Sequence, residues 1–288
     1  MEGFMRRALI IGCGDIGRRV ALRLEHHFRL YALTRDSRRF NVPGVIPIKA
    51  DLDQADSLKG AVKGMHILFH FAPPQPGGDR DIRTRHLVSA LLQGSILPHQ
   101  IIYISTSGVY GNRGGTWLAE TSPVAPQTPR ARRRLDAERV LLQLGFRGVR
   151  VNILRTPGIY AENRLPQKRI AAGTPVLYQE EDSISNHIHA DDLADIICAL
   201  PRFGRPGRVY HAADGCPLAM GEYMDAVADA LGLQRPPRIS RKQAQEILPD
   251  EMLSFLSESR QLSNHRLAEL RVRLNYPSVK AFLGNLVR

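Results

Sequence analysis

The stretch RALIIGCGDIGRRVALRLEHH, residues 7–27, decides the fold of this chain. Its beginning, RALIIG (7–12), is a continuous apolar run of the kind that forms a fully buried strand. Its end, DIGRRVALRLEHH (15–27), places apolar residues at helical spacing among arginines. A buried strand that enters a helix through a glycine-rich turn predicts the first unit of a parallel α/β sheet.

The connecting turn, GCGDIG, has the spacing Gly12-x-Gly14-x-x-Gly17. This spacing is a weak signal alone, but between a strand and a helix it indicates dinucleotide binding. Gly12 permits a tight turn, Gly14 lets a diphosphate approach the backbone, and Gly17 lets helix and strand pack closely. The unpaired N–H groups at the start of the helix attract negative charge. The alternative is an ordinary strand-to-helix turn without a ligand.

Strand-like apolar runs alternate with helical patterns along the first half of the chain. The predicted strands cover residues 7–12, 29–34, 45–51, 66–72, 100–106 and 149–155. The predicted helices cover residues 15–27, 55–64, 81–94 and 132–145. Near-continuous apolar strands separated by helices predict a parallel sheet covered on both faces. Right-handed crossovers then give a doubly wound α/β fold of the Rossmann type.

The pattern changes after residue 155. A stretch rich in Pro and Gly (156–175) precedes a predicted helix (186–200) and a predicted strand (208–214), and the remainder is mostly helical with a basic tail. We therefore expect a dinucleotide-binding domain and a smaller, mostly helical substrate-binding domain. The first comprises residues 1–160 with 186–216 returning to it, and the second comprises 161–185 and 217–288.

Composition limits the class of protein. The chain has 288 residues, of which 43% are hydrophobic, so it can build a substantial core. No apolar run reaches the roughly 18 residues of a membrane span, and the N-terminal residues show no signal-peptide pattern. The cysteines Cys13, Cys198 and Cys216 lack metal-binding spacing. We expect reduced thiols, no metal site, no membrane association and a cytoplasmic location.

The formal net charge is +12. The arginines are spread along the whole chain and no nucleic-acid-binding module is evident, so we do not expect a specific nucleic-acid partner. A solvated basic surface is one interpretation of the charge. The other is that part of it meets an anionic small molecule, such as a phosphorylated cofactor.

The end of the second predicted strand bears on the choice of cofactor. NAD sites usually place Asp or Glu there to accept a hydrogen bond from the ribose 2′-hydroxyl. Here Thr34 and Arg35 hold that place, with Arg38 close by, and guanidinium groups suit a 2′-phosphate. The sequence therefore favours NADP, whereas the adjacent Asp36 keeps NAD as the alternative.

The next two strands end in residues that suit the rest of a dinucleotide. Asp51 and Leu52 follow the third strand and can bracket an adenine, and Ala72, Pro73 and Pro74 end the fourth. Small, rigid residues there leave room for a ribose. The carboxyl ends of parallel strands form the ligand edge of a doubly wound sheet, so these residues are expected to lie together.

Several stretches, in the same order, resemble the extended short-chain dehydrogenases/reductases, the nucleotide-sugar epimerase/dehydratase group. They are YISTSGVYGNRGGTWLAETSPVAP (103–126), LRTPGIYAENR (154–164), NHIHADDLADII (186–197), RVYHAADGCPLAMGEY (208–223) and SRQLSNHRLAELRVRLNYPSVKAFL (259–283). The resemblance covers nearly the whole chain. Within the group, the chain is most similar to an atypical branch with G-x-G-x-x-G in place of G-x-x-G-x-x-G.

The resemblance implies an NAD(P)-binding Rossmann domain and a C-terminal domain that closes over the substrate. It also implies catalysis by a Ser or Thr and by the Tyr and Lys of Y-x-x-x-K. Thr106 matches the Ser/Thr position, but in PRARRRLDAE (129–138) Arg130 stands at the place of the tyrosine and Arg134 at that of the lysine. The residues expected to contact the cofactor are Gly12, Gly14, Asp15, Ile16, Gly17, Thr34, Arg35, Arg38, Asp51, Leu52, Ala72, Pro73 and Pro157.

The two arginines change the expected chemistry. A guanidinium does not release its proton near neutral pH, so Arg130 cannot act as the family's tyrosine, although it can grip an anion. Arg134 can still donate hydrogen bonds to a ribose, but a solvated helix face is an equally open interpretation. The candidates for catalysis are Thr106, Tyr110, Arg130 and Arg134. Tyr160, Tyr178, His187, His189, Asp191 and Asp192 are further titratable groups.

Two functional hypotheses follow. In the first, the protein is an NAD(P)-dependent oxidoreductase or epimerase/dehydratase that acts on a carbonyl or hydroxyl of a small anionic substrate. Thr106 orients the reacting oxygen, Arg134 the ribose, and Arg130 a negative group of the substrate. In the second, it is a non-catalytic sensor of NADP(H), because the family's tyrosine and lysine are missing. The sequence does not decide whether the protein forms a homodimer.

Overall fold

A seven-stranded parallel sheet forms the centre of the structure, a computed structural model that describes residues 5–94 and 96–286. The strand order is β12-β7-β5-β4-β1-β2-β3. The strands are β1 (Arg7–Ile11), β2 (Arg29–Thr34), β3 (Val45–Lys49), β4 (Ile67–His70), β5 (Gln100–Thr106), β7 (Arg150–Thr156) and β12 (Val209–His211). The order reverses between β1 and β4, which is the switch point where a doubly wound sheet opens a ligand crevice.

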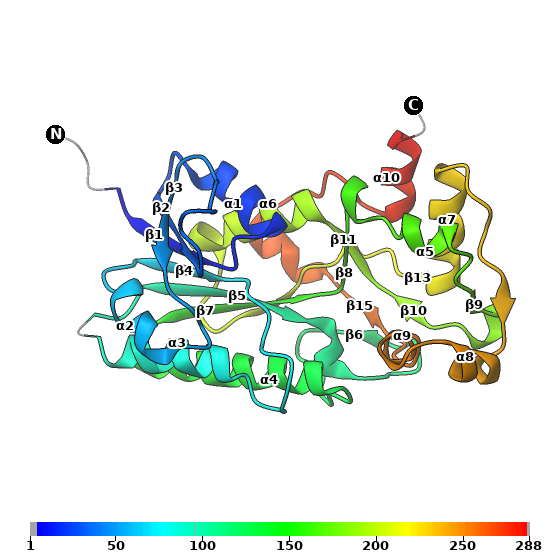
Figure 1. Ribbon diagram of the computed structural model, residues 1–288, viewed down its shortest axis with the longest axis horizontal. Coiled ribbons are helices and arrows are strands. Elements are labelled where there is room, and N and C mark those ends of the chain that lie inside the picture. The colour runs from blue at the N-terminus through cyan, green and yellow to red at the C-terminus, as the bar shows by residue number, and fades with distance from the viewer. Residues whose placement is uncertain (1–4, 95, 287–288) are drawn as a thin grey trace.

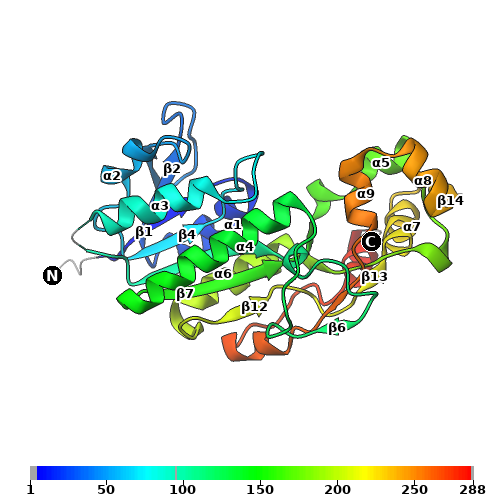
Figure 2. The ribbon, with the colours of Figure 1, turned by 90° about the horizontal axis from the view of Figure 1, so that it is seen from below.

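Helices cover both faces of the sheet (Figures 1 and 2). One face carries α1 (Asp15–Leu24) and α6 (Ala190–Phe203), and the other carries α2 (Leu58–Ala61), α3 (Ile82–Leu92) and α4 (Pro129–Leu142). Side chains alternate between the two cores along β1: Ala8 and Ile10 pack with the first set, and Leu9 and Ile11 with the second. Burial on both sides explains why this strand is apolar at every position after Arg7.

The predicted strands and helices of the first half are present. β2 and β5 have the bounds predicted from the sequence. β3 lies at the edge of the sheet, where its Pro47, paired with Ala32, removes no hydrogen bond to a further strand. Thr128 caps α4 by accepting a hydrogen bond from the N–H of Ala131, so the helix begins at Pro129.

One prediction of secondary structure is wrong. Residues 186–200 were expected to form a single helix, but β11 (His187–His189) pairs in parallel with β8 (Gly158–Tyr160), and α6 begins only at Ala190. The His189 side chain accepts a hydrogen bond from the N–H of Asp191 and so caps α6. Strand pairing satisfies the backbone before this cap, and a helical pattern in the sequence does not show such a pairing.

The C-terminal part contains short helices and two-stranded ladders. The helices are α5 (Gln167–Ala171), α7 (Met220–Ala230), α8 (Arg241–Ile247), α9 (Asp250–Leu256) and α10 (Val279–Leu286). The short strands are β6 (Trp117–Leu118), β9 (Val176–Leu177), β10 (Ile184–Ser185), β13 (Leu218–Ala219), β14 (Arg238–Ile239) and β15 (Gln261–Leu262). Short 3₁₀ helices occur at Ala55–Ser57, Ser107–Tyr110, Gln143–Arg147, Glu162–Arg164, Gln179–Glu181 and His265–Leu270.

These elements have their own apolar core, which includes Tyr160, Val176, Val227 and Phe282. Figure 1 shows this part beside the carboxyl end of the sheet. The division into two domains at the expected boundaries stays a prediction. Along the described ranges, no helix combines the length and the apolar character needed to cross a membrane.

Candidate cofactor and substrate site

The glycines of the first turn occupy three different environments. Gly12 has φ +93°, and a Cβ on it would lie 2.5 Å from the backbone nitrogen of Ala72, so no other residue fits there. A Cβ on Gly17 would lie 2.9 Å from the carbonyl oxygen of Gly12. At Gly14, by contrast, a Cβ would meet no described atom within 4 Å. The backbone at Gly14 is therefore open to a ligand, which fits the diphosphate of a dinucleotide.

The start of α1 supplies the donors for such a group. Gly14 is the N-cap and carries no side chain to satisfy the first N–H groups of the helix. Asp15, the first helical residue, accepts hydrogen bonds from Arg19 at 3.1 Å and from Arg164 at 2.6 Å. Partial burial acts to raise the pKa of Asp15, but these two guanidinium groups hold it below its usual value. Asp15 is thus an anion that two cations neutralise.

A cavity of about 290 Å³ lies beyond this turn at the carboxyl ends of the first strands. Several residues predicted from the sequence line it: Gly12, Thr34, Arg35, Asp51, Leu52, Ala72 and Pro73. Its size and position suit an adenosine. Arg38 does not line it; the side chain of Arg38 is 93% exposed and lies 3.8 Å from Asp36.

Arg35 and Asp36 are adjacent in the chain, but only Arg35 faces the cavity. In the described parts of the chain the Arg35 side chain makes no hydrogen bond or ion pair, although its charge acts on Asp53, and it lines the cavity. Asp36 accepts a hydrogen bond from the N–H of Arg38 and pairs with Arg39 at 3.5 Å. The carboxylate therefore serves its own loop, whereas the guanidinium is available to an anion.

Arg83 also lines this cavity, although no motif in the sequence indicates it. It makes a bidentate pair with Asp53, with distances of 2.7 and 2.6 Å, and donates to the carbonyl of Pro73 at 3.2 Å. Arg83 lies in the first turn of α3, which starts near the ligand edge. That position is the one signal that could have identified it.

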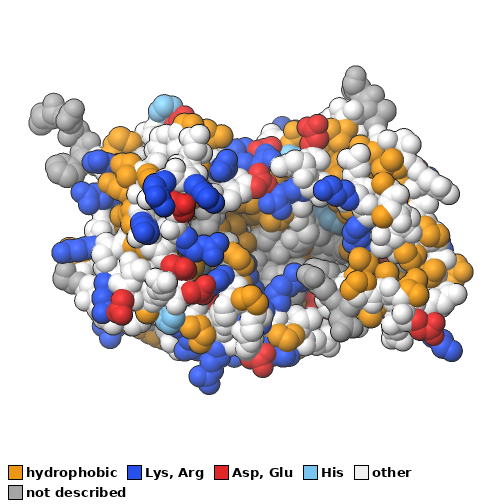
Figure 3. Space-filling view, viewed as in Figure 1, with side chains coloured by type: hydrophobic (Ala, Val, Ile, Leu, Met, Phe, Trp, Pro, Cys, Tyr) orange, Lys and Arg blue, Asp and Glu red, His pale blue; other side chains and the backbone are white. Residues whose placement is uncertain are grey.

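A second cavity, of about 330 Å³, lies between the end of β5 and the C-terminal elements. Its lining includes Thr106, Arg130, Pro157, Arg164, His187 and Arg260. The hydroxyl oxygen of Thr106 accepts a hydrogen bond from the N–H of Gly108 at 3.1 Å, which leaves the hydroxyl hydrogen to donate into the cavity. The space-filling view shows the molecule hollowed near its middle, with Lys and Arg side chains around the hollow (Figure 3).

Arginines predominate among the charged residues that line this second cavity. Arg130, Arg164 and Arg260 line it, and the carboxylate among the lining residues is Glu258. Arg260 pairs with Glu258 at 2.9 Å and donates to the carbonyl of Gly111 at 2.9 Å. Within the described residues, its buried Nε has no hydrogen-bond partner. A small anion is therefore the complement of this cavity.

Arg134 lies deeper than Arg130. Its Nη1 donates to the carbonyl oxygens of Ala72, at 3.3 Å, and Ile104, at 2.9 Å, and to the hydroxyl of Tyr103 at 3.1 Å. The guanidinium thus ties the carboxyl ends of β4 and β5 together. Its expected contact with a ribose stays a prediction.

Tyr110 lies in a network of buried polar side chains, and the catalytic role considered from the sequence stays a prediction. Its side chain is fully buried, and its hydroxyl contacts Nε2 of His211 at 2.6 Å and Nη1 of Arg155 at 2.7 Å. Arg155 is itself paired with the buried Glu138 at 2.8 Å. Burial raises the pKa of Tyr110 to about 12, so this phenol does not exchange its proton near neutral pH.

Of the other titratable candidates, some make structural contacts away from the Thr106 cavity and one lines it. Tyr160 is buried and donates to the carbonyl of Tyr276 at 3.3 Å, and Asp191 pairs with arginines of α1. His187 does line the Thr106 cavity, and its ring stacks on Tyr223 with centroids 4.4 Å apart. Burial lowers the pKa of His187 to about 4, so its ring is neutral at physiological pH.

A family model described as NAD(P)H-binding matches residues 12–201. Among curated proteins, a dTDP-glucose 4,6-dehydratase of Streptomyces antibioticus is 26% identical over 213 residues, which are 66% of this chain and 62% of that protein. The chain thus spans less than two thirds of the length of the curated relatives that it matches.

Two solved structures extend the comparison to the fold. A conserved protein of unknown function from Silicibacter pomeroyi DSS is 25% identical, with a TM-score of 0.79 over 98% of each chain. DesIV, a dTDP-glucose 4,6-dehydratase from Streptomyces venezuelae solved with NAD and TYD bound, is 20% identical, with a TM-score of 0.78 over 98% of this chain and 95% of its own. At this level of identity the second likeness shows a shared Rossmann-like fold.

Proposed function

Because this chain belongs to the NAD(P)H-binding family, we propose that it is an NAD(P)-dependent oxidoreductase of the epimerase/dehydratase type. Its substrate is a small molecule with a carbonyl or hydroxyl group and a negative charge. One observation carries the proposal. The cavity at the ends of β1 to β4, the open backbone at Gly14 and the cavity beside Thr106 follow one another along the ligand edge of the sheet.

The roles of the residues follow from their contacts. When bound, the nicotinamide supplies the group that takes up or returns a hydride. Thr106 donates its hydroxyl hydrogen to the reacting oxygen of the substrate, because its own oxygen already accepts from Gly108. Arg130 and Arg260 hold the negative group of the substrate. His187 lies on the wall of the same cavity as a neutral ring, which can donate or accept a hydrogen bond to the substrate.

The test measures binding and turnover separately. Binding of NADPH and NADH is followed by fluorescence and by melting temperature, and turnover by loss of NADPH absorbance with a panel of carbonyl compounds with and without phosphate or carboxylate groups. Micromolar binding with turnover of anionic carbonyls supports the proposal. Absence of binding by both coenzymes overturns it.

NADP is the coenzyme that we propose, because Arg35 faces the adenosine cavity while Asp36 serves its own loop. Hydrogen bonds to charged groups contribute about 1.5–3 kcal/mol, so Arg35→Ala is expected to weaken NADPH binding about 10- to 100-fold. NADH binding should change little. Arg38→Ala, which removes a charge outside the cavity, is the matched control. Equal loss of both coenzymes in Arg35→Ala would contradict the assignment.

A second candidate function is a sensor that binds NADP(H) without turnover. The observation that favours it is Arg130 at the place of the catalytic tyrosine. Binding of NADPH without oxidation by any carbonyl of the panel would support the sensor. The variant Arg130→Tyr with Arg134→Lys restores the family's pair, and a gain of reductase activity would show that the proton donor was the missing part.

A further inference from the structure

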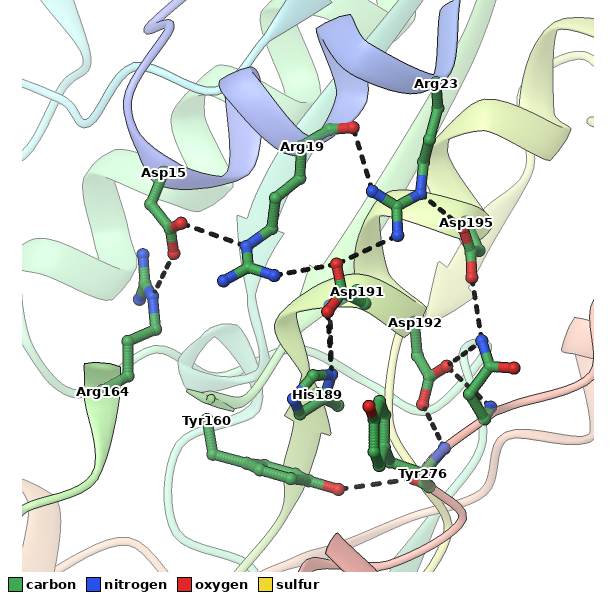
Figure 4. Close-up of polar contacts among 11 residues, drawn as sticks. Asp15, Arg19, Arg23, Tyr160, Arg164, His189, Asp191, Asp192, Asp195 and Tyr276 are labelled. Atoms are coloured by element: carbon green, nitrogen blue, oxygen red, sulfur yellow. Dashed lines mark hydrogen bonds and ion pairs between the residues drawn. The ribbon is translucent and has the colours of Figure 1, made fainter. Parts of the chain in front are cut away.

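An ion pair joins the glycine turn to a segment that lines the Thr106 cavity; we call the space between the two the cleft. Nε of Arg164 donates to Oδ2 of Asp15 at 2.6 Å, although the two residues are 149 positions apart. Arg164 ends the 3₁₀ helix Glu162–Arg164 that follows β8, and Asp15 begins α1. Figure 4 shows the two side chains reaching toward each other from these elements. The contact therefore joins the expected cofactor turn to a segment of the expected substrate domain.

The two cations on Asp15 differ in their other partners. Arg19 also donates to Asp191 at 2.8 Å, and Asp191 is shared with Arg23 (Figure 4). The charge of Arg19 is thus divided between carboxylates of α1 and α6. The bond from Arg164 uses Nε, and the terminal N–H groups of its guanidinium can serve another acceptor.

The position of Arg164 puts those groups within the cleft. Its side chain is 34% exposed, and it lines the Thr106 cavity together with Pro157. Arg164 therefore stands between the open backbone at Gly14 and the place proposed for the substrate.

The charges around the start of α1 favour binding of the diphosphate by Arg164. The first N–H groups of α1 attract an anion, but the carboxylate of Asp15 on the same turn repels one. Arg164 pairs with that carboxylate through Nε, so its positive charge offsets the repulsion while its terminal N–H groups stay available to the anion. Guanidinium groups bind phosphate oxygens in bidentate geometry, which suits Arg164 better than a lysine for this purpose.

We propose that Arg164 is a ligand of the cofactor's diphosphate, contributed from the substrate side of the cleft, and that Asp15 holds it in place in the free protein. The inference rests on the proposed cofactor site. It has one consequence for substrate binding: the segment that carries Arg164 also forms a wall of the Thr106 cavity, so a bound cofactor positions that wall before the substrate enters.

The test compares ligands that contain a diphosphate with one that does not. NADPH and ADP-ribose contain it, and adenosine 2′-monophosphate fills the adenosine cavity without it. For Arg164→Ala, the Kd of NADPH and ADP-ribose should rise about 10- to 100-fold, whereas the Kd of adenosine 2′-monophosphate should stay unchanged. Arg164→Lys should recover part of the loss, since it keeps the charge without the bidentate geometry. Calorimetry gives the three constants without any turnover.

Lys168→Ala is the matched control, because it removes an exposed positive charge from the neighbouring helix α5. It should leave all three constants unchanged, and an unchanged melting temperature shows that each variant is folded. Equal weakening of adenosine 2′-monophosphate, or no weakening of ADP-ribose, would overturn the role of Arg164. Absence of NADPH and ADP-ribose binding by the unaltered protein would instead overturn the proposed function.

Discussion

The arginines at the start of α4 do not share one role. Arg130 lines the Thr106 cavity, whereas Arg132 pairs with Asp79 at 2.9 Å on the surface. Arg133 is buried and donates to the carbonyl of Gly78, and Arg134 donates to the carbonyls that end β4 and β5. A run of positive charge in the sequence thus divides into a cavity residue, a surface pair and two supports of the backbone.

Gly12 and Gly14 allow a prediction that separates folding from binding. Gly12→Ala places a Cβ 2.5 Å from the nitrogen of Ala72 at a φ of +93°, so strain and collision should reduce the free energy of unfolding by about 1–3 kcal/mol or more. Gly14→Ala meets no described atom within 4 Å and should leave that free energy nearly unchanged. Its methyl group nevertheless fills the space proposed for the diphosphate, so NADPH binding should be lost. Urea unfolding and calorimetry measure the two quantities, and normal NADPH binding by Gly14→Ala would refute the proposed position.

Elements buried on both faces were the most predictable part of the chain. Their strands are nearly continuous apolar runs, and their bounds agree with the structure to within a few residues at β1, β2, β5 and β7. The segment His187–His189 was mistaken for helix because its strand pairs with β8, which is remote in the sequence. Burial leaves a periodic pattern of apolar residues in the sequence, so elements formed by burial can be identified from it. A short two-stranded ladder depends on a partner strand elsewhere in the chain, and its own residues need not show a strand pattern.

α4 is fixed to the sheet by a buried ion pair, which gives a prediction for this element. Glu138 of α4 accepts from Arg155 of β7 at 2.8 and 3.2 Å, and both side chains are buried. Glu138→Ala leaves a buried guanidinium without the carboxylate that balances its charge, so the free energy of unfolding should fall by about 3–5 kcal/mol. Glu222→Ala, which breaks an exposed pair with Lys280, should change it by at most about 1 kcal/mol. Urea unfolding compares the two variants, and similar small effects would contradict the assignment.

The whole molecule is built so that distant segments meet at the cleft. The Thr106 cavity is lined from β5, α4, the loop after β8 and the residue Arg260 near the end of the chain. Arg19 and Arg23 of α1 bind Asp191 of α6 at 2.8 and 3.0 Å on the other side of the sheet. Charge pairs thus join α1 to α6, and the pair of Asp15 with Arg164 joins α1 to a wall of the Thr106 cavity.

Asp214 lies where the sheet meets the C-terminal part, and it predicts a pH dependence. Its N–H donates to the carbonyl of His187 at 2.8 Å, and burial, assisted by Asp192, raises the pKa of its carboxyl to about 7. Between the pKa of the unfolded chain, near 4, and this value, the folded protein holds a proton that the unfolded chain has released. The stabilising effect of Asp214 is therefore complete at low pH and is lost as the pH rises toward 7.

The variant Asp214→Asn tests this sign. Its free energy of unfolding, relative to that of the unaltered protein, should increase as the pH is raised from about 4 to about 8, because asparagine does not ionise. Asp229→Asn, an exposed carboxylate paired with Arg235, serves as the control and should not show this increase. A difference for Asp214→Asn that is independent of pH would rule out the buried, proton-retaining carboxyl.

The sequence alone determined the parallel sheet, most of its helices and strands and the glycine turn, and the family model confirms the expected NAD(P)H-binding family. The curated relatives, which are dTDP-glucose 4,6-dehydratases, agree with the resemblance to the epimerase/dehydratase group. These features depend on neighbours in the chain: periodic burial, a glycine spacing, or motifs in a fixed order. Most of the residues predicted for the adenosine also lie together, because carboxyl ends of parallel strands meet at one edge.

Only the tertiary structure decided the positions of Arg83, Arg164 and Arg260, the buried place of Tyr110, and the arginine-lined second cavity. An arginine is long and carries its charge far from its backbone, so its partner is set by whichever carboxylate or carbonyl the fold brings near. Arg164 and Asp15 meet across 149 positions of sequence. Pairing over such a distance leaves no local pattern, and that is why the sequence could show the arginines but not what they hold.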